Sequence, residues 1–239
     1  MMRSEAPWPL DSQVLRLKRL RFGWPSSPRL VAIDDLVLGA GGTLFIGGPS
    51  GSGKSTLLGL LSGVIKASEG ECCVSGVDFS RASPTLRDRI RADSLGVIFQ
   101  QFNLLPYLSV AENVQLSLSF SALRRQQSRA IYGSEAQQAE HLLNALGLPR
   151  SLWRQPAHQL SVGQQQRVAV CRALMGAPRL IIADEPTSAL DEDNRCAFLE
   201  LLLQTRQEQG AALVMVSHDL RMATAFEQTL VLGAGGGSS

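Results

Sequence analysis

The sequence GPSGSGKST at residues 48–56 has the spacing G-x-x-x-x-G-K-[ST]. Glycine permits backbone angles that let successive N–H groups converge on one anion. This glycine-rich loop (residues 48–56) follows an apolar run at 43–46. The leucine-rich segment 55–63 after it predicts a helix whose positive end faces the same anion. Lysine occurs only at Lys18, Lys54 and Lys66, so a chance match to the pattern is improbable. We therefore expect the loop to bind the phosphates of a nucleotide.

The residues of the loop have separate expected roles. Lys54 supplies a point charge to the β- and γ-phosphates, and the Ser55 hydroxyl takes a coordination position on Mg²⁺. The alternative is a flexible glycine and serine turn that binds nothing. The residues expected to bind ATP here are Gly48, Pro49, Ser50, Gly51, Ser52, Gly53, Lys54, Ser55 and Thr56.

Three more short apolar runs, at 96–99, 180–183 and 212–216, have the composition of buried strands. Helical patterns alternate with them, for example at 191–209, where Gly210 follows as a C-cap. This alternation predicts an α/β fold with a mostly parallel sheet covered on both faces. In such sheets ligands bind beyond the carboxyl ends of the strands.

Polar side chains follow each of these three runs. Asp184 and Glu185 come directly after 180–183, and we expect Asp184 to hold Mg²⁺ and Glu185 to act as the general base toward an attacking water. Gln100 follows 96–99 and can touch both the metal and the water, while His218 can contact the γ-phosphate and orient the base. Taken singly, each has an ordinary alternative as a solvated or surface residue; together they predict a catalytic site.

A second anion site is predicted at the start of the helical segment 160–174. Ser161 is a natural N-cap, Gln164 stands where its capping-box partner belongs, and Gly163 allows close approach. The alternative is an ordinary helix start. Because this tip has no lysine or acid of its own, the pattern suggests that another subunit completes the site.

Two aromatic residues near the N-terminus, Phe22 and Trp24, could stack on an adenine ring, or could pack on an edge strand. The basic residues that precede them alternate partly with leucines and indicate a solvated strand face. The middle segment, from about residue 102 to 158, lacks a strand run and predicts an inserted helical subdomain. Its polar stretch 124–129 is read as a solvated helix face or loop, and the glycine-rich tail 233–239 as flexible.

Composition excludes several classes of protein. The chain has 239 residues, 44% of them apolar and 18% charged, which is typical of a globular protein. The net charge of +2 does not predict non-specific attraction to nucleic acid, so no nucleic-acid partner is expected. No apolar run reaches the roughly 18 residues of a membrane span, and the N-terminus lacks a signal-peptide pattern. The four cysteines have neither metal nor disulfide spacing, which indicates a reduced, cytosolic chain.

Residues 15–232 resemble the nucleotide-binding subunit of an ATP-binding-cassette (ABC) transporter, because the family's motifs occur in order. Trp24, followed by Pro25, is similar to the aromatic residue that stacks on adenine. Val162 departs from the glycine usual in the signature motif. The matching motifs are the glycine-rich loop as Walker A, Gln100 as the Q-loop, LSVGQQQRV (160–168) as the signature, LIIADEP (180–186) as Walker B, 188–191 as the D-loop and His218 as the switch histidine.

The resemblance implies a single ABC domain over 1–239 with a P-loop NTPase core. The core and an antiparallel N-terminal β part would occupy 14–100 and 165–232, and the helical subdomain 101–164. It also implies an ATPase that uses Mg²⁺, and a homodimer that holds each ATP between Walker A and B of one copy and Ser161, Gly163 and Gln164 of the other. A membrane-spanning transporter subunit would hold the dimer at the cytoplasmic face of the inner or plasma membrane.

The segment FNLLPYLSVAENV (102–114) resembles the branch of the family that serves lipoprotein release, macrolide export and cell-division signalling. One alternative function is therefore a regulatory ATPase that signals through a membrane partner without transport. A soluble ABC ATPase acting on DNA or ribosomes is another alternative, but it would need a long insertion or a second cassette.

Overall fold

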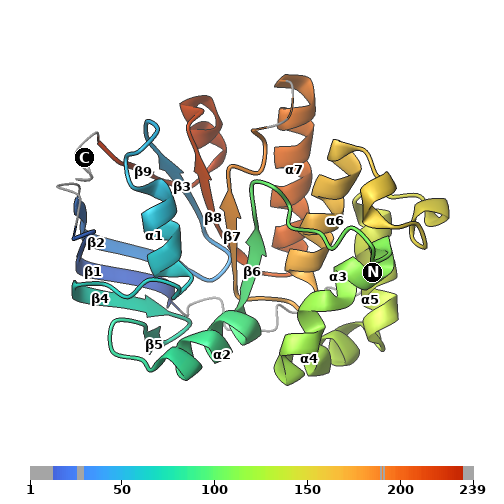
Figure 1. Cartoon of the computed structure of the whole chain (residues 1–239), viewed down its shortest axis with the longest axis horizontal. Coiled ribbons are helices and arrows are strands. Elements are labelled where there is room, and N and C mark those ends of the chain that lie inside the picture. Colours follow the sequence, from blue (N-terminus) through green and yellow to red (C-terminus); the bar gives the residue numbers. More distant parts are fainter. Residues whose placement is uncertain (1–12, 26–29, 189, 191, 234–239) are drawn as a thin grey trace.

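The computed structural model describes residues 13–25, 30–188, 190 and 192–233, and its strands form two sheets (Figure 1). Residues 234–239 of the predicted tail 233–239 and two residues of the predicted D-loop, Ala189 and Asp191, lie outside the described residues. A five-stranded sheet has the order β6-β7-β8-β3-β9, and all its neighbours pair in parallel. Its strands are β3 (Thr43–Gly47), β6 (Leu95–Ile98), β7 (Leu180–Asp184), β8 (Ala212–Ser217) and β9 (Gln228–Val231). The predicted mixed architecture with a parallel sheet is confirmed.

An antiparallel sheet of order β2-β1-β4-β5 stands beside the parallel one (Figure 1). Helix α1 (Lys54–Leu61) packs its leucines between the two sheets. The antiparallel strands are β1 (Gln13–Gly23), β2 (Leu30–Gly39), β4 (Glu69–Val74) and β5 (Val77–Asp78).

The parallel sheet is buried on both faces. Along β3, Leu44 and Ile46 belong to the core shared with α1, while Phe45 belongs to the core on the other side. Successive residues of a strand point to opposite faces, so a strand covered on both sides must be apolar throughout. The second core is closed by α6 (Val162–Leu174) and α7 (Glu192–Glu208).

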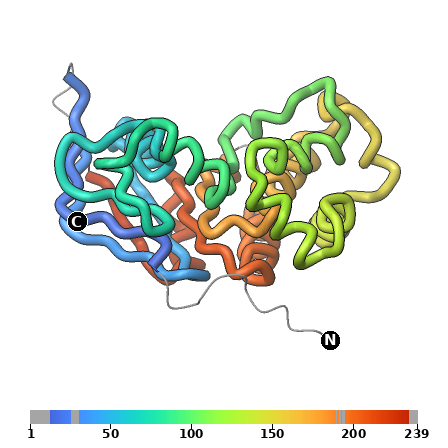
Figure 2. The backbone as a smooth tube through the Cα atoms, turned by 90° about the horizontal axis from the view of Figure 1, so that it is seen from below, coloured from blue at the N-terminus to red at the C-terminus, as the bar shows by residue number. Residues whose placement is uncertain are grey.

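The remaining helices gather largely on one side of the molecule (Figure 2). The segment 101–164, predicted to be a helical subdomain, is described throughout and contains no strand, only an isolated bridge between Ser109 and Pro156. Nowhere in the described residues is a helix both long and apolar enough to cross a membrane. The helices not yet named are α2 (Pro84–Ser94), α3 (Val110–Gln115), η1 (Leu116–Phe120), α4 (Ala122–Tyr132), α5 (Glu135–Ala145), η2 (Arg150–Leu152), η3 (Ala157–Gln159) and η4 (Leu220–Ala225).

The polar stretch 124–129 is part of α4, but the expectation that it is a solvated face is wrong at Arg124 and Ser128, which are both buried. Arg124 is 3% exposed. Its guanidinium donates to the carbonyl oxygens of Leu95 (3.1 Å), Ala173 (2.8 Å) and Met175 (2.8 Å). Burial lowers the pKa of Arg124 to about 10. This side chain therefore ties α4 to the start of β6 and to the end of α6.

Replacing Arg124 should destabilise the protein strongly. The substitution Arg124→Met would leave three buried carbonyl groups unpaired, and we expect a loss of about 3–5 kcal/mol in the free energy of unfolding. The matched control is Arg129→Met in the same helix, because Arg129 is an exposed partner of Glu135 and should change stability by only about 0.5 kcal/mol. Urea unfolding followed by circular dichroism measures both. Equal losses would contradict the assigned role of Arg124.

Candidate active site

The conformation of the glycine-rich loop depends on glycine at two positions. Gly48 has φ +153°, and a Cβ there would lie 2.6 Å from Ser52 Oγ and 2.7 Å from the carbonyl oxygen of Leu232. Gly53, at φ +98°, is the N-cap of α1. In the described structure no side chain caps α1 and its first turn holds no acid, so its positive end is available to an anion.

The loop holds a buried cation. Lys54 is 7% exposed, and its Nζ donates to the carbonyl oxygens of Gly48 at 2.8 Å and Pro49 at 2.9 Å. Ser52 is buried as well, and its Oγ has no hydrogen-bond partner among the described residues. A shielded ammonium, an orphaned hydroxyl and a free helix end fit the phosphates of a nucleotide.

The predicted acids and histidine come together at the carboxyl edge of the sheet. Glu185 follows β7 and His218 follows β8, its parallel neighbour, and His218 Nδ1 lies 3.0 Å from Glu185 Oε2. The Glu185 backbone N–H donates to the Val216 carbonyl (2.9 Å), and Glu185 has φ +42°, a value uncommon outside glycine. The pairing of β7 with β8 thus fixes both partners.

Asp184 is an acid whose charge is only partly compensated in this structure. Burial, and then the charge of Glu185, raise the pKa of Asp184, while Lys54 lowers it by a smaller amount. The influence of Lys54 means that the glycine-rich loop and this acid share one site. A half-buried carboxylate beside a second carboxylate is the donor set that a hard cation such as Mg²⁺ requires.

The other two predicted contacts lie at the border of this group. Gln100 is exposed in the turn after β6, which pairs with β7. Trp24 is 49% exposed, and its Nε1 donates to Thr56 Oγ1 at 3.3 Å, so its ring lies beside α1. Phe22, the alternative aromatic residue, belongs to the core. Its ring packs edge-on against the Trp24 ring, with 5.1 Å between the ring centroids.

The predicted second anion site is a well-formed helix start, which we call the α6 tip (residues 161–164). Ser161 Oγ accepts from the Gln164 backbone N–H (3.3 Å), and Gln164 Oε1 accepts from the Ser161 N–H (2.9 Å). A Cβ built on Gly163 would meet no described atom within 4 Å, and Val162 is half exposed. The tip is therefore open to a partner.

A single chain does not bring the α6 tip to the glycine-rich loop. Leu57 of α1 belongs to the core on one face of the parallel sheet, and Val168 of α6 to the core on the other. Within its own chain, α6 is instead joined to the loop after β7, because the buried Gln166 donates Nε2–H to the carbonyl of Pro186 at 2.6 Å. This contact could not be predicted from the sequence, since a glutamine that binds a backbone carbonyl leaves no sequence pattern.

Comparisons with known proteins agree with this geometry. The sequence model of the family described as "ABC transporter" matches residues 33–188. An uncharacterized ABC transporter ATP-binding protein, YbbA of Escherichia coli K12, is 41% identical over 198 residues, which are 83% of each chain. The ATP-binding protein LolD of a lipoprotein-releasing system, from Legionella pneumophila strain Paris, is 38% identical over 84% of this chain and 85% of its own.

A solved structure is similar over almost the whole chain. It is the dimeric post-hydrolysis state of the ATP-binding cassette MJ0796, of Methanocaldococcus jannaschii, bound to ADP and Pi. Its TM-score is 0.73 at 33% identity, covering 91% of this chain and 94% of that one.

The two aspartates at the sheet edge should affect stability in opposite directions. A raised folded-state pKa means that stability falls as pH rises through the pKa of Asp184, so the neutral Asp184→Asn should stabilise the nucleotide-free protein at pH 7. Hydrogen bonds and charge from Arg221, together with the charge of Arg195, lower the pKa of Asp219 to about 2. The stabilising contribution of ionised Asp219 is therefore complete above its unfolded-state pKa and is lost as pH falls toward 2. Because Asp219→Asn removes this contribution, it should destabilise the folded protein at pH 7.

Thermal unfolding of the two variants at pH 7 measures both signs against wild type. A lower midpoint for Asp184→Asn would show that Asp184 is well compensated without a cation. An unchanged midpoint for Asp219→Asn would show that its arginine contacts contribute nothing.

Proposed function

This chain belongs to the ABC transporter family, and from that premise we propose that it is the ATP-hydrolysing subunit of a transporter. Two copies dimerise around two ATP molecules and drive a conformational change in a membrane-spanning partner subunit. The observation that supports the proposal is that, within one chain, α1, which follows the glycine-rich loop, and α6, which begins at the α6 tip, pack on opposite faces of the sheet. A two-fold dimer places the α6 tip of each copy against the glycine-rich loop of the other.

ATP binding is the task of the glycine-rich loop and Trp24. The loop N–H groups and the α1 end surround the phosphates, and Lys54 exchanges the carbonyls of Gly48 and Pro49 for the β- and γ-phosphate oxygens. The exposed Trp24 ring beside Thr56 stacks on adenine.

Hydrolysis is the task of Glu185 and His218. Glu185 takes a proton from the water that attacks the γ-phosphorus, the bond from that phosphorus to the bridging oxygen breaks, and ADP and phosphate leave. His218 donates Nδ1–H to Glu185 and holds the carboxylate toward the water. When the imidazole is protonated, its other nitrogen donates to a γ-phosphate oxygen.

Asp184, the Ser55 hydroxyl and the Gln100 amide oxygen would hold Mg²⁺. When bound, the ion neutralises the charge of the β- and γ-phosphate oxygens. The raised pKa of Asp184 supports this assignment, because a cation at that place relieves the repulsion from Glu185.

Dimer closure couples ATP to the membrane partner. Only the closed dimer satisfies the γ-phosphate from both sides, so ATP favours it and hydrolysis releases it. The loop after Gln100 and helices α3 to α5 transmit the movement to a partner that holds the dimer at the cytoplasmic face of the membrane. Similarity to an ATP-binding protein of a lipoprotein-releasing system favours export or extrusion over uptake.

Removing the general base should stop the cycle after ATP binding. Glu185→Gln should lower kcat by at least about 100-fold while ATP still binds, because the amide cannot accept the proton of the water. An ATP-dependent dimer should then accumulate, measured by size exclusion with light scattering. A variant that hydrolyses ATP at the wild-type rate would remove Glu185 from this role.

The α6 tip should be needed for dimerisation and not for folding. In the Glu185→Gln background, Gly163→Asp should abolish the ATP-dependent dimer, because it places a carboxylate against the γ-phosphate of the other copy. The matched control is Gly39→Asp, since a Cβ at Gly39 also meets no described atom within 4 Å. Light scattering and thermal unfolding separate the two effects. A Gly163→Asp chain that still dimerises with ATP would exclude the tip from the interface.

A further inference from the structure

Several contacts join the segments that follow β7 and β8, and two of them matter for the histidine. The first is the contact between Glu185 and His218 described above. The second lies farther from the strands, at Arg195 near the start of α7. Its Nη1 donates to Asp219 Oδ2 at 2.5 Å, and its Nη2 donates to the carbonyl oxygen of Leu190 at 3.2 Å. One guanidinium therefore spans both loops.

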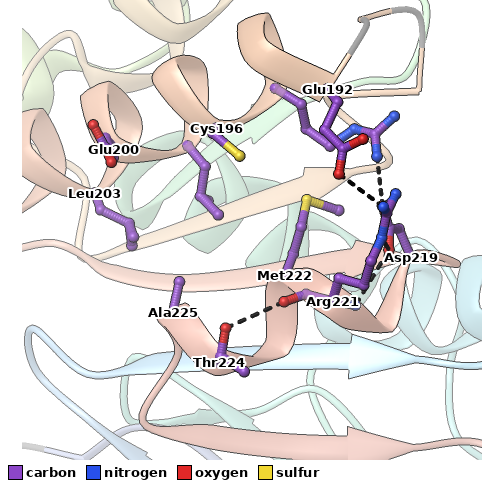
Figure 3. Close-up of a pocket in the computed structure, with 11 residues that line it drawn as sticks. Glu192, Cys196, Glu200, Leu203, Asp219, Arg221, Met222, Thr224 and Ala225 are labelled. Carbon is purple, nitrogen blue, oxygen red and sulfur yellow. Dashed lines mark hydrogen bonds and ion pairs between the residues drawn. The ribbon is translucent and has the colours of Figure 1, made fainter.

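The Arg195 contact is sheltered from solvent. The side chains of Arg195 and Asp219 are 21% and 14% exposed. The nearby pair of Arg221 and Glu192 joins the same two segments at 2.8 Å (Figure 3), but its side chains are 66% and 71% exposed. Solvent and salt weaken the outer pair far more than the inner one. Arg195 is thus the stronger of the two connections.

Apolar side chains lie beside the contact. Arg195 and Asp219 line a cavity of about 230 Å³ between α7 and η4, with Leu199 and Met222 among its apolar lining (Figure 3). Low polarity beside an ion pair strengthens it and makes the loss of one partner costly.

Asp219 transmits this restraint to the histidine beside it. Its Oδ1 accepts from the backbone N–H of Arg221 (3.2 Å) and caps η4, and its own N–H donates to Ser217 Oγ (3.1 Å). Arg221 Nη2 also donates to Asp219 Oδ2 at 2.8 Å. The pKa of about 2 keeps this carboxylate ionised at neutral pH. The backbone on both sides of Asp219 is therefore fixed, and His218 precedes it directly.

We propose that Arg195 is a positioning residue for His218, which it holds through Asp219 at hydrogen-bond distance from Glu185. The proposal rests on the role given to His218 above. Arg195 also donates to the Leu190 carbonyl. It therefore holds the loop that begins at Glu185 at a fixed distance from the loop that carries His218. Loss of the restraint should lower kcat and leave KM for ATP almost unchanged, since neither Arg195 nor Asp219 is among the residues assigned to ATP binding.

The test is a double-mutant cycle on ATP hydrolysis by the full chain, with single-turnover measurements for the slow variants. Arg195→Gln should lower kcat about 10-fold with KM within about twofold. Arg195→Lys, which keeps the charge, should recover part of the loss. The matched control is Glu192→Gln, which removes only the exposed outer pair and should keep wild-type kcat. In a His218→Ala background, Arg195→Gln should have little further effect.

Each result decides between the two proposals. Wild-type kcat for Arg195→Gln overturns the positioning role. A full 10-fold loss that persists in the His218→Ala background also overturns it, because Arg195 would then act through general stability. If Arg195→Gln does not fold, Arg195→Lys and Asp219→Asn take its place in the same cycle. Wild-type kcat for His218→Ala alone would overturn the role of His218 in the proposed function, and this inference with it.

Discussion

The parallel register of β3, β8 and β7 is the constraint on which the site depends. Gly47 pairs with Ser217, and Asp184 pairs with Val216, so the three strands end at the same edge of the sheet. The glycine-rich loop, the acids and His218 begin directly beyond those positions. A slip of one residue between β7 and β8 would separate Glu185 from His218, which are in contact at 3.0 Å, and a slip between β3 and β8 would displace the glycine-rich loop from His218.

This edge concentrates features that work against stability. Asp184 carries a charge that burial and Glu185 disfavour, Lys54 is buried among carbonyls, and Glu185 has a left-handed backbone. The apolar cores on both faces of the sheet offset these costs, and bound nucleotide would relieve them. The charged groups at this edge of the sheet thus complete their interactions only when ATP and a second copy of the chain are bound.

Much of this arrangement could be predicted from the sequence, because its signals are local. The glycine-rich loop, the four apolar runs and the Ser161 capping box each act within a few residues, and the structure has a strand or helix at each. The connections between distant segments could not be predicted. Arg124 and Gln166 bind backbone carbonyls far along the chain, and every residue has such a carbonyl, so no sequence pattern marks the partner. Arg195 likewise binds Asp219, which lies on a different loop. Arg124 in particular lies in a polar stretch that is otherwise typical of a solvated helix.

Mixing two inactive chains tests most directly whether ATP is held between copies. One chain carries Lys54→Ala and keeps its α6 tip, and the other carries Gly163→Asp and keeps its glycine-rich loop. A mixed dimer then contains one site with both elements intact, so ATP hydrolysis by the mixture should rise well above that of either chain alone. A mixture no more active than its separate components would contradict a shared site and place hydrolysis within a single chain.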